Sequence, residues 1–265
     1  DLQRWYQRWY APNNAIAVVV GDVDPEDVLA LAKKYFGPLK AEEIVPPKPR
    51  LEPVQKGKRY ITVQAPAEVP YTIMGYKTPV LKTAADDWEP YALEVLANVL
   101  DGGTSARLTR ELVRGSQIAN SAGAGYDLYD RQEGLFLLDA TPADGHSIAD
   151  VQQALFEQVQ RLKDTPVEAD ELERIKAGVV ASNIYEQDSS FYQAMKVGQL
   201  EAIGLEWKLA DVYVERIKAV TAEQVQAVAK KYLVEESLTI AELDPLPMQA
   251  GSKPRVAAKG GGHGH

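Results

Sequence analysis

A helix followed by a short polar joint and a β-branched strand occurs twice in this sequence, once near each end. Residues 1–22, DLQRWYQRWYAPNNAIAVVVGD, align without a gap with residues 223–244, EQVQAVAKKYLVEESLTIAELD, so that Tyr10 meets Tyr232. Both segments change from a helical period to a β-branched run, which predicts a helix and then a strand. If the match is a true repeat, the structural unit is 222 residues long, the offset between the two copies. The alternative is chance, because helix followed by strand is a common unit.

The start of the chain fits the repeat interpretation. Its first residues are predicted to lie in a helix already under way, with no N-cap residue before it. They also lack the basic and apolar regions of a signal peptide. We therefore expect a fragment or a processed chain, in which the first copy survives only as its last elements and most of it lies upstream of Asp1.

Proline and glycine mark the expected domain boundaries. Asp24-Pro25 predicts the start of a helix that ends at Gly37-Pro38. Residues 45–53, VPPKPRLEP, hold four prolines and predict an extended linker. We expect the following organisation: residues 1–44 as the helix–strand–helix end of a first domain, 45–57 as a proline-rich linker, 58–245 as a second domain, and 246–265, rich in glycine, proline and alanine, as a disordered tail.

The second domain is predicted to have strands at both of its ends and helices clustered between them. The expected strands are 58–65, 71–78, about 117–127, about 133–141 and 237–243; the expected helices are 87–100, 105–114, 147–163, 167–187, about 191–204, 206–219 and 222–233. Thr221 and Gln224 form a capping box for the last helix. This pattern predicts an α+β layered sandwich, in which a mostly antiparallel sheet packs on helices.

Composition excludes several classes of protein. The net charge is −9 and the pI is near 5.0, which argues against a nucleic-acid partner. No apolar run approaches the roughly 20 residues that span a bilayer, so we expect no membrane insertion. The absence of cysteine excludes disulfides, thiolate zinc sites and cysteine nucleophiles.

The sequence predicts no catalytic residue, no metal ligand and no cofactor in this chain. Its histidines are His146, in a turn before a helix, and His263 and His265, in the glycine-rich tail. The motifs H-E-x-x-H, H-x-x-E-H and G-x-S-x-G are absent from the sequence. Adjacent carboxylates occur only at helix starts or in loops, where the helix dipole or water favours them.

The loop Gly102-Gly103-Thr104-Ser105 can be interpreted in two ways. A phosphate-binding loop would follow a strand and carry a lysine near its end. Here a predicted helix precedes the loop, and no lysine occurs between Lys82 and Lys163. Glycine at the end of one helix and a hydroxyl side chain at the start of the next instead predict a structural joint between two helices.

At this loop, and in a second stretch near the N-terminus, the sequence resembles a known family. GGTSARLTRELVRGSQIANSAGA, residues 102–124, is similar to the segment G-G-x-S-S-R-L-F followed by R-E-x-x-G-L-A-Y-S-V-S-A of the pitrilysin/insulinase family of zinc metallopeptidases. Residues 9–39 resemble the end of that family's first domain. The resemblance covers residues 1–245 and is carried by these matches: Gly102, Gly103, Ser105, Arg107, Leu108, Ile118, Ala119 and Ser121.

The resemblance implies a two-domain architecture, and it implies that this chain lacks the family's zinc motif and substrate-gripping residues. The family's half-molecule consists of two homologous α+β domains, which fits the repeat, and its zinc motif H-x-x-E-H belongs to the first domain. Residues 1–44 would then end a zinc-type first domain, and the zinc of the parent enzyme would be bound upstream. Many members also carry an arginine and, seven residues later, a tyrosine that grip substrate. Val113 and Asn120 occupy those positions here, so we expect no substrate-binding residue there.

The resemblance therefore implies a non-catalytic C-terminal domain of a zinc metalloendopeptidase, forming a wall of the substrate chamber and a subunit interface. Its expected partners are a peptide or unfolded protein substrate and a second homologous chain or half-molecule. The sequence leaves the location unknown, and only the family resemblance suggests a bacterial periplasm or envelope. Two alternatives remain open: a catalytically dead structural or processing-partner subunit of the same family, and an unrelated α+β binding module.

Overall fold

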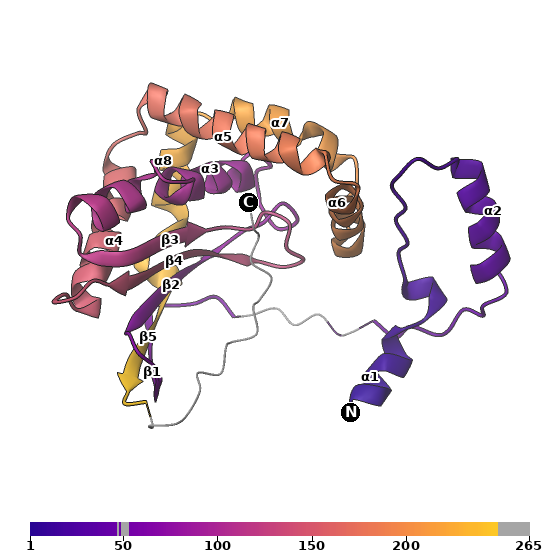
Figure 1. The fold of residues 1–265 in the computed structure, drawn as a ribbon, viewed down its shortest axis with the longest axis horizontal. Coiled ribbons are helices and arrows are strands. Elements are labelled where there is room, and N and C mark those ends of the chain that lie inside the picture. The colour runs from indigo at the N-terminus through magenta and orange to yellow at the C-terminus, as the bar shows by residue number, and fades with distance from the viewer. Residues whose placement is uncertain (47, 49–52, 249–265) are drawn as a thin grey trace.

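The computed structural model describes residues 1–46, 48 and 53–248, which form a sheet covered by helices and a separate N-terminal segment (Figure 1). The helices are α1 (Leu2–Trp9), η1 (Pro12–Asn14), α2 (Pro25–Phe36), α3 (Glu89–Asp101), η2 (Thr109–Gly115), α4 (Ile148–Asp164), α5 (Ala169–Gln187), α6 (Ser190–Ile203), α7 (Leu209–Ala219), α8 (Ala222–Tyr232) and η3 (Glu235–Ser237). The strands are β1 (Arg59–Pro66), β2 (Tyr71–Thr78), β3 (Ala119–Gly125), β4 (Gly134–Pro142) and β5 (Leu238–Leu246).

The five strands form one mixed sheet in the order β1-β5-β2-β4-β3. β5, the last strand of the chain, lies between β1 and β2, parallel to the first and antiparallel to the second. The other pairs, β2 with β4 and β4 with β3, are antiparallel. The predicted α+β sandwich with a mostly antiparallel sheet is confirmed.

Helices cover one face of this sheet. Met74, Tyr76, Phe136 and Leu138 point into that layer and are 0–2% exposed. They belong to one core cluster with the buried side of α3 and with residues of α4 and α8. Figure 1 shows α5 and α7 above α3 and the strands below it. Alternate side chains along each strand point toward the helices, and they pack there against the apolar stripe of each helix in a single core.

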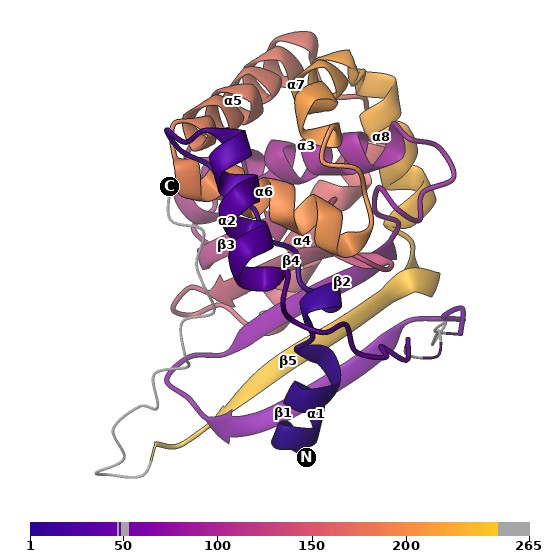
Figure 2. The ribbon, with the colours of Figure 1, turned by 90° about the vertical axis from the view of Figure 1, so that its right-hand side faces the viewer.

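The opposite face of the sheet carries exposed apolar side chains. Ile73 on β2 lies between buried Thr72 and Met74, so it points away from the helices and is 38% exposed. Leu135 and Leu137 on β4, and Ile61 and Val63 on β1, are also exposed, and register places them on the same face. We call these five residues, Ile61, Val63, Ile73, Leu135 and Leu137, the open sheet face. Figure 2 shows β1, β5 and β2 running below the helical layer.

The N-terminal segment, residues 1–44, lies to one side of the sheet and its helices (Figure 1). Neither α1 nor α2 has a buried residue. The segment is closed on itself by Asn13, whose amide donates to the carbonyl oxygen of Glu42 and accepts from its N–H. The strand expected within residues 1–22, after the helix and the polar joint, is wrong: residues 15–22 are assigned to no strand. A strand needs a neighbour to satisfy its backbone groups, and the described part of the chain places no strand beside them.

Most of the predicted elements of the second domain lie within three residues of their expected bounds, with two differences. The expected helix 105–114 begins at residue 107 and is a π-helix from 109, with the N–H of Ser116 bonded to the carbonyl oxygen of Glu111. β5 extends to Leu246, so the expected tail begins too early. Pairing of β5 with β1 as far as Pro66 is the reason. The rest of the disorder prediction, from residue 249 onward, and linker residues 47 and 49–52 lie outside the described residues.

Candidate functional site

The loop after α3 requires glycine at two successive positions for different reasons. A Cβ on Gly102 would lie 2.4 Å from the backbone oxygen of Asn98, one turn earlier in α3. Gly103 has a φ of +112°, a region that side chains other than glycine rarely adopt. The two glycines therefore end α3 and turn the chain toward η2, as a joint between helices would.

Ser105 and Arg107, which follow the two glycines, hold α5 against this joint between helices. The guanidinium of Arg174 on α5 donates to the hydroxyl oxygen of Ser105, at 2.7 Å. Arg107 makes a bidentate ion pair with Glu171 in the first turn of α5, with distances of 3.0 and 2.6 Å. The two side chains are only 9% and 14% exposed. Burial acts to raise the pKa of Glu171, but the hydrogen bonds and charge of Arg107 outweigh it and hold that pKa below its ordinary value.

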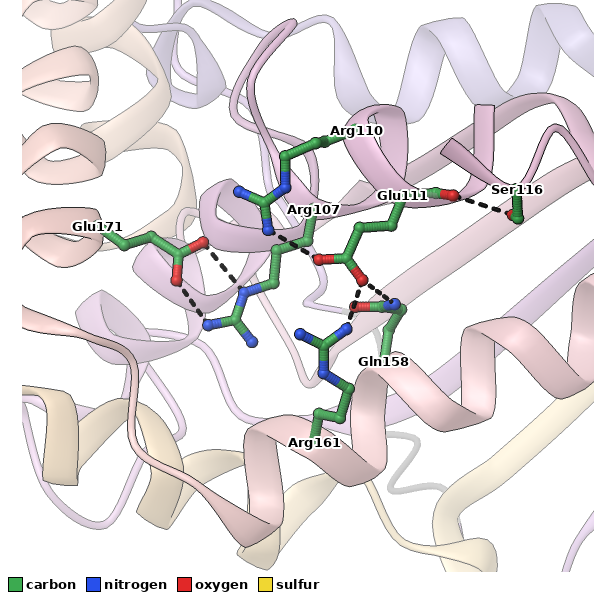
Figure 3. A network of polar contacts seen from close by, with 7 residues as sticks. All are labelled: Arg107, Arg110, Glu111, Ser116, Gln158, Arg161 and Glu171. Atoms are coloured by element: carbon green, nitrogen blue, oxygen red, sulfur yellow. Dashed lines mark hydrogen bonds and ion pairs between the residues drawn. The ribbon is translucent and has the colours of Figure 1, made fainter. Parts of the chain in front are cut away.

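A second carboxylate, Glu111 on η2, is enclosed by donors (Figure 3). Arg110 donates to it at 2.7 Å and Gln158 of α4 at 2.8 Å, and Arg161 of α4 also pairs with it. Burial opposes ionisation, but these hydrogen bonds lower the pKa of Glu111 to about 2. Figure 3 shows this group beside the Arg107–Glu171 pair; the first joins η2 to α4, and the second joins the residues just before η2 to α5. Both clusters connect elements of the fold, which is a structural role.

Val113 and Asn120, which were expected to align with a substrate-gripping arginine and tyrosine, make other contacts. Val113 is half-buried and packs against the core. Asn120 is the extra residue of a β-bulge in β3, and its amide donates to the carbonyl oxygen of Pro142 at 3.2 Å. Between them, Gln117 has a φ of +56°, the left-handed region that favours glycine. Neither side chain carries the charge of an arginine or the phenol of a tyrosine.

Sequence reasoning missed a cleft of about 1230 Å³ beside α3 and α6. We call it the α3–α6 cleft; its polar floor consists of Glu94 on α3, Tyr129 after β3, Lys196 on α6 and Tyr213 on α7. Burial is the main reason that the pKa of Glu94 is raised, to about 7, although Tyr213 and Lys196 lower it. The only signal in the sequence is a glutamate inside an apolar helical run, EPYALEVLANVL.

The described residues do not fit a zinc ion. No three His, Asp or Glu side chains among them come together as a metal site would require. His146, the histidine within the described ranges, is exposed in the turn before α4. His263 and His265 lie outside those ranges. The longer helices that the structure describes are also too short or too polar to cross a membrane.

The fold and these contacts define an α+β domain in which Ser105 and Arg107 of the loop segment connect helices. Comparison with known proteins identifies its family. A family profile described as the peptidase M16 inactive domain matches residues 1–179. The chain belongs to this family, and the resemblance to pitrilysin/insulinase metallopeptidases is confirmed.

Similar proteins are named as zinc proteases. Zinc protease PqqE of Helicobacter pylori is 30% identical over 193 residues, 72% of this chain and 42% of PqqE. An uncharacterized zinc protease of Mycobacterium leprae is 25% identical over 236 residues, 88% of this chain and 52% of the relative. The chain thus spans about half the length of the curated relatives that it matches.

Solved structures share the fold. A crystal structure of a protease from Helicobacter pylori superposes with a TM-score of 0.85 and 26% identity, over 92% of this chain and 58% of that one. A peptidase M16 inactive domain from Pseudomonas fluorescens gives a TM-score of 0.69 at 19% identity, over 88% and 54% of the two chains.

Proposed function

We propose that this chain is the non-catalytic C-terminal part of a zinc metalloendopeptidase, and that its open sheet face forms a wall of the chamber that holds a peptide or unfolded protein substrate. The observation that carries the proposal is an apolar sheet face left uncovered in a member of the peptidase M16 inactive-domain family. Exposed apolar surface of this kind marks a binding or interaction site. An extended polypeptide can bury alternate side chains on such a surface.

The N-terminal segment supports the presence of a homologous first domain, to which residues 1–44 would belong. Its helices α1 and α2 bury nothing, yet they carry exposed Trp5, Tyr6, Leu29 and Phe36. Residues 1–44 would complete the end of that other domain, which would supply the missing partner strand. The exposed apolar side chains of α1 and α2 would also form the interface between that domain and this one.

The zinc of the parent enzyme would be held by that other domain. The described part of this chain offers no fitting ligand set, so its own residues bind and position substrate without taking part in the chemistry. On its own, the chain should therefore not hydrolyse peptides.

Site-specific cross-linking tests the chamber wall, because the natural sequence contains no cysteine. A benzophenone is attached to Ile73→Cys on the open sheet face and, as the matched control, to Ala219→Cys at the exposed end of α7. The probe is reduced, carboxymethylated α-lactalbumin, an unfolded chain. We expect cross-links from position 73 well above those from position 219. Equal yields from the two positions would contradict the wall.

A protease assay with added zinc tests the non-catalytic role. The chain should show no turnover of the same unfolded protein, and chelator-sensitive turnover would overturn that role. If the full-length protein is also inactive with zinc, the chain belongs instead to a catalytically dead subunit.

A further inference from the structure

The α3–α6 cleft is lined by an excess of acidic side chains. Its walls come from α3, from the connection between β3 and β4, and from α5, α6 and α7. Carboxylates outnumber cationic side chains in the lining by six to two: Glu94, Asp101, Asp127, Asp130, Glu133 and Glu186 against Arg174 and Lys196. A concave surface with low-dielectric walls strengthens the field of such a group, so the cleft attracts cations.

The floor of the cleft holds two buried polar atoms that lack a partner. One carboxylate oxygen of Glu94, Oε1, accepts a hydrogen bond from the Tyr213 hydroxyl at 2.5 Å. The other, Oε2, is buried and makes no hydrogen bond. The hydroxyl of Tyr129, a residue only 8% exposed, is likewise buried and unpaired. A buried carboxylate oxygen without a donor is costly, so a ligand that brings a charged donor to this point is favoured.

The aromatic walls already hold one cation. The ammonium of Lys196 lies 3.5 Å from the ring centroid of Tyr129 and 5.4 Å from that of Tyr213. It thus lies on ring faces, in a cation–π contact, rather than in an ion pair with Glu94. Lys196 comes from α6, whose one buried residue is Leu200, so the element that carries it is weakly anchored.

The cleft opens toward the surface proposed to hold substrate. Leu135 and Leu137 line the cleft and also belong to the open sheet face. A polypeptide lying on that face can therefore direct one side chain into the cleft while its neighbours stay on apolar surface.

We propose that the α3–α6 cleft binds the guanidinium of an arginine side chain in an extended polypeptide, with apolar residues of that polypeptide lying on the open sheet face. The planar guanidinium offers several donors to Glu94 and stacks on tyrosine rings, which an ammonium does less well. This inference rests on the proposed function, because it assigns a class of substrate to the same surface.

Binding of two labelled decapeptides tests the proposal. Both have capped ends and an alanine, leucine and serine sequence; one carries a single arginine, and the other carries citrulline, which is neutral and has the same shape. Burial raises the pKa of Glu94 to about 7. The charges of Asp127 and Glu186 add to this shift, and Tyr213 and Lys196 oppose it. Fluorescence anisotropy is therefore measured near pH 8, where Glu94 is mostly ionised.

Four variants separate the contributions. Glu94→Gln should weaken binding of the arginine peptide by about tenfold, or about 1.4 kcal/mol, and leave the citrulline peptide unchanged. Tyr129→Phe, which removes one hydroxyl and keeps the ring, should weaken it by about threefold. Lys196→Met should strengthen it by removing a competing cation. Glu68→Gln, the same chemical change at an exposed residue outside the cleft, should change nothing.

Equal affinity for the arginine and citrulline peptides would overturn the inference, as would equal effects of Glu94→Gln and Glu68→Gln. Should Glu94→Gln fail to fold, Tyr129→Phe and Lys196→Met decide in its place: unchanged affinity in both would overturn it. Cross-linking from Ile73→Cys is independent of these variants. A positive cross-link with a failed cleft test refutes the arginine site alone, whereas lost cross-linking refutes the chamber wall.

Discussion

Replacing Arg107 by methionine should strongly destabilise the domain. The change keeps an unbranched side chain but leaves the carboxylate of Glu171 without its bidentate partner. The two side chains are 9% and 14% exposed, so the pair is nearly buried. Burial acts to raise the pKa of Glu171, and the hydrogen bonds and charge of Arg107 are the main offset, so without Arg107 an ionised Glu171 would be a nearly buried charge with its main compensation removed. Breaking a buried pair from one side costs about 3–5 kcal/mol.

The lower end of that range applies here, because Arg174 remains close enough to Glu171 to stabilise its charge. We therefore expect a loss of about 3 kcal/mol in the free energy of unfolding. Urea unfolding followed by near-UV circular dichroism, which reports the buried tyrosines, is the assay. For a urea m-value of about 3 kcal/mol/M, the midpoint falls by about 1 M.

Two further variants make the experiment decisive. Arg110→Met is the matched control, because Arg110 is 49% exposed in its contact with Glu111, and an exposed pair is worth less than about 1 kcal/mol. The double variant of Arg107→Met with Glu171→Leu should recover much of the loss, since no buried charge is then left unpaired. If Arg107→Met costs no more than Arg110→Met, the ion pair does not hold α5 in place and the reasoning is wrong.

Four other changes have calculable outcomes. Gln117→Gly should raise the thermal midpoint, because it relieves a left-handed φ worth about 1 kcal/mol. Gly102→Ala should cost about 1–3 kcal/mol in urea unfolding, because its Cβ would overlap the Asn98 oxygen. Glu111, with a pKa lowered from 4.5 to about 2, adds stability above pH 4.5 that is lost as pH falls toward 2. Its side chain is 25% exposed, so solvent screening limits the amount to about 1–2 kcal/mol, and Glu111→Gln should flatten the acid limb of stability against pH. The contribution of Glu94 to stability depends on pH in the opposite direction. Because its pKa is raised, the free energy of unfolding falls as pH rises from 4.5 to about 7, and Glu94→Gln should remove that decline.

Local patterns predicted most elements because the rules behind them act over a few residues. The capping box of Thr221 and Gln224 forms as expected, at 3.2 Å from the Gln224 N–H to the Thr221 hydroxyl. The helix and turn expected in residues 1–22 also form, and α1 and η1 lie at nearly the same offset from α8 and η3. The strand expected after them does not form, because a strand depends on a neighbour that can come from anywhere in the chain.

The sequence by itself determined the α+β class, the glycine joint after α3, and the absence of a charged or phenolic side chain at Val113 and Asn120. These follow from periodicity, backbone freedom and residue identity, which are all local. Only the tertiary structure decided that β5 lies between β1 and β2, and that one sheet face stays open. It alone brought Glu94, Tyr129 and Lys196 together from separate elements. Strand pairing and desolvation act between residues far apart in the sequence, and no local pattern encodes which groups will meet.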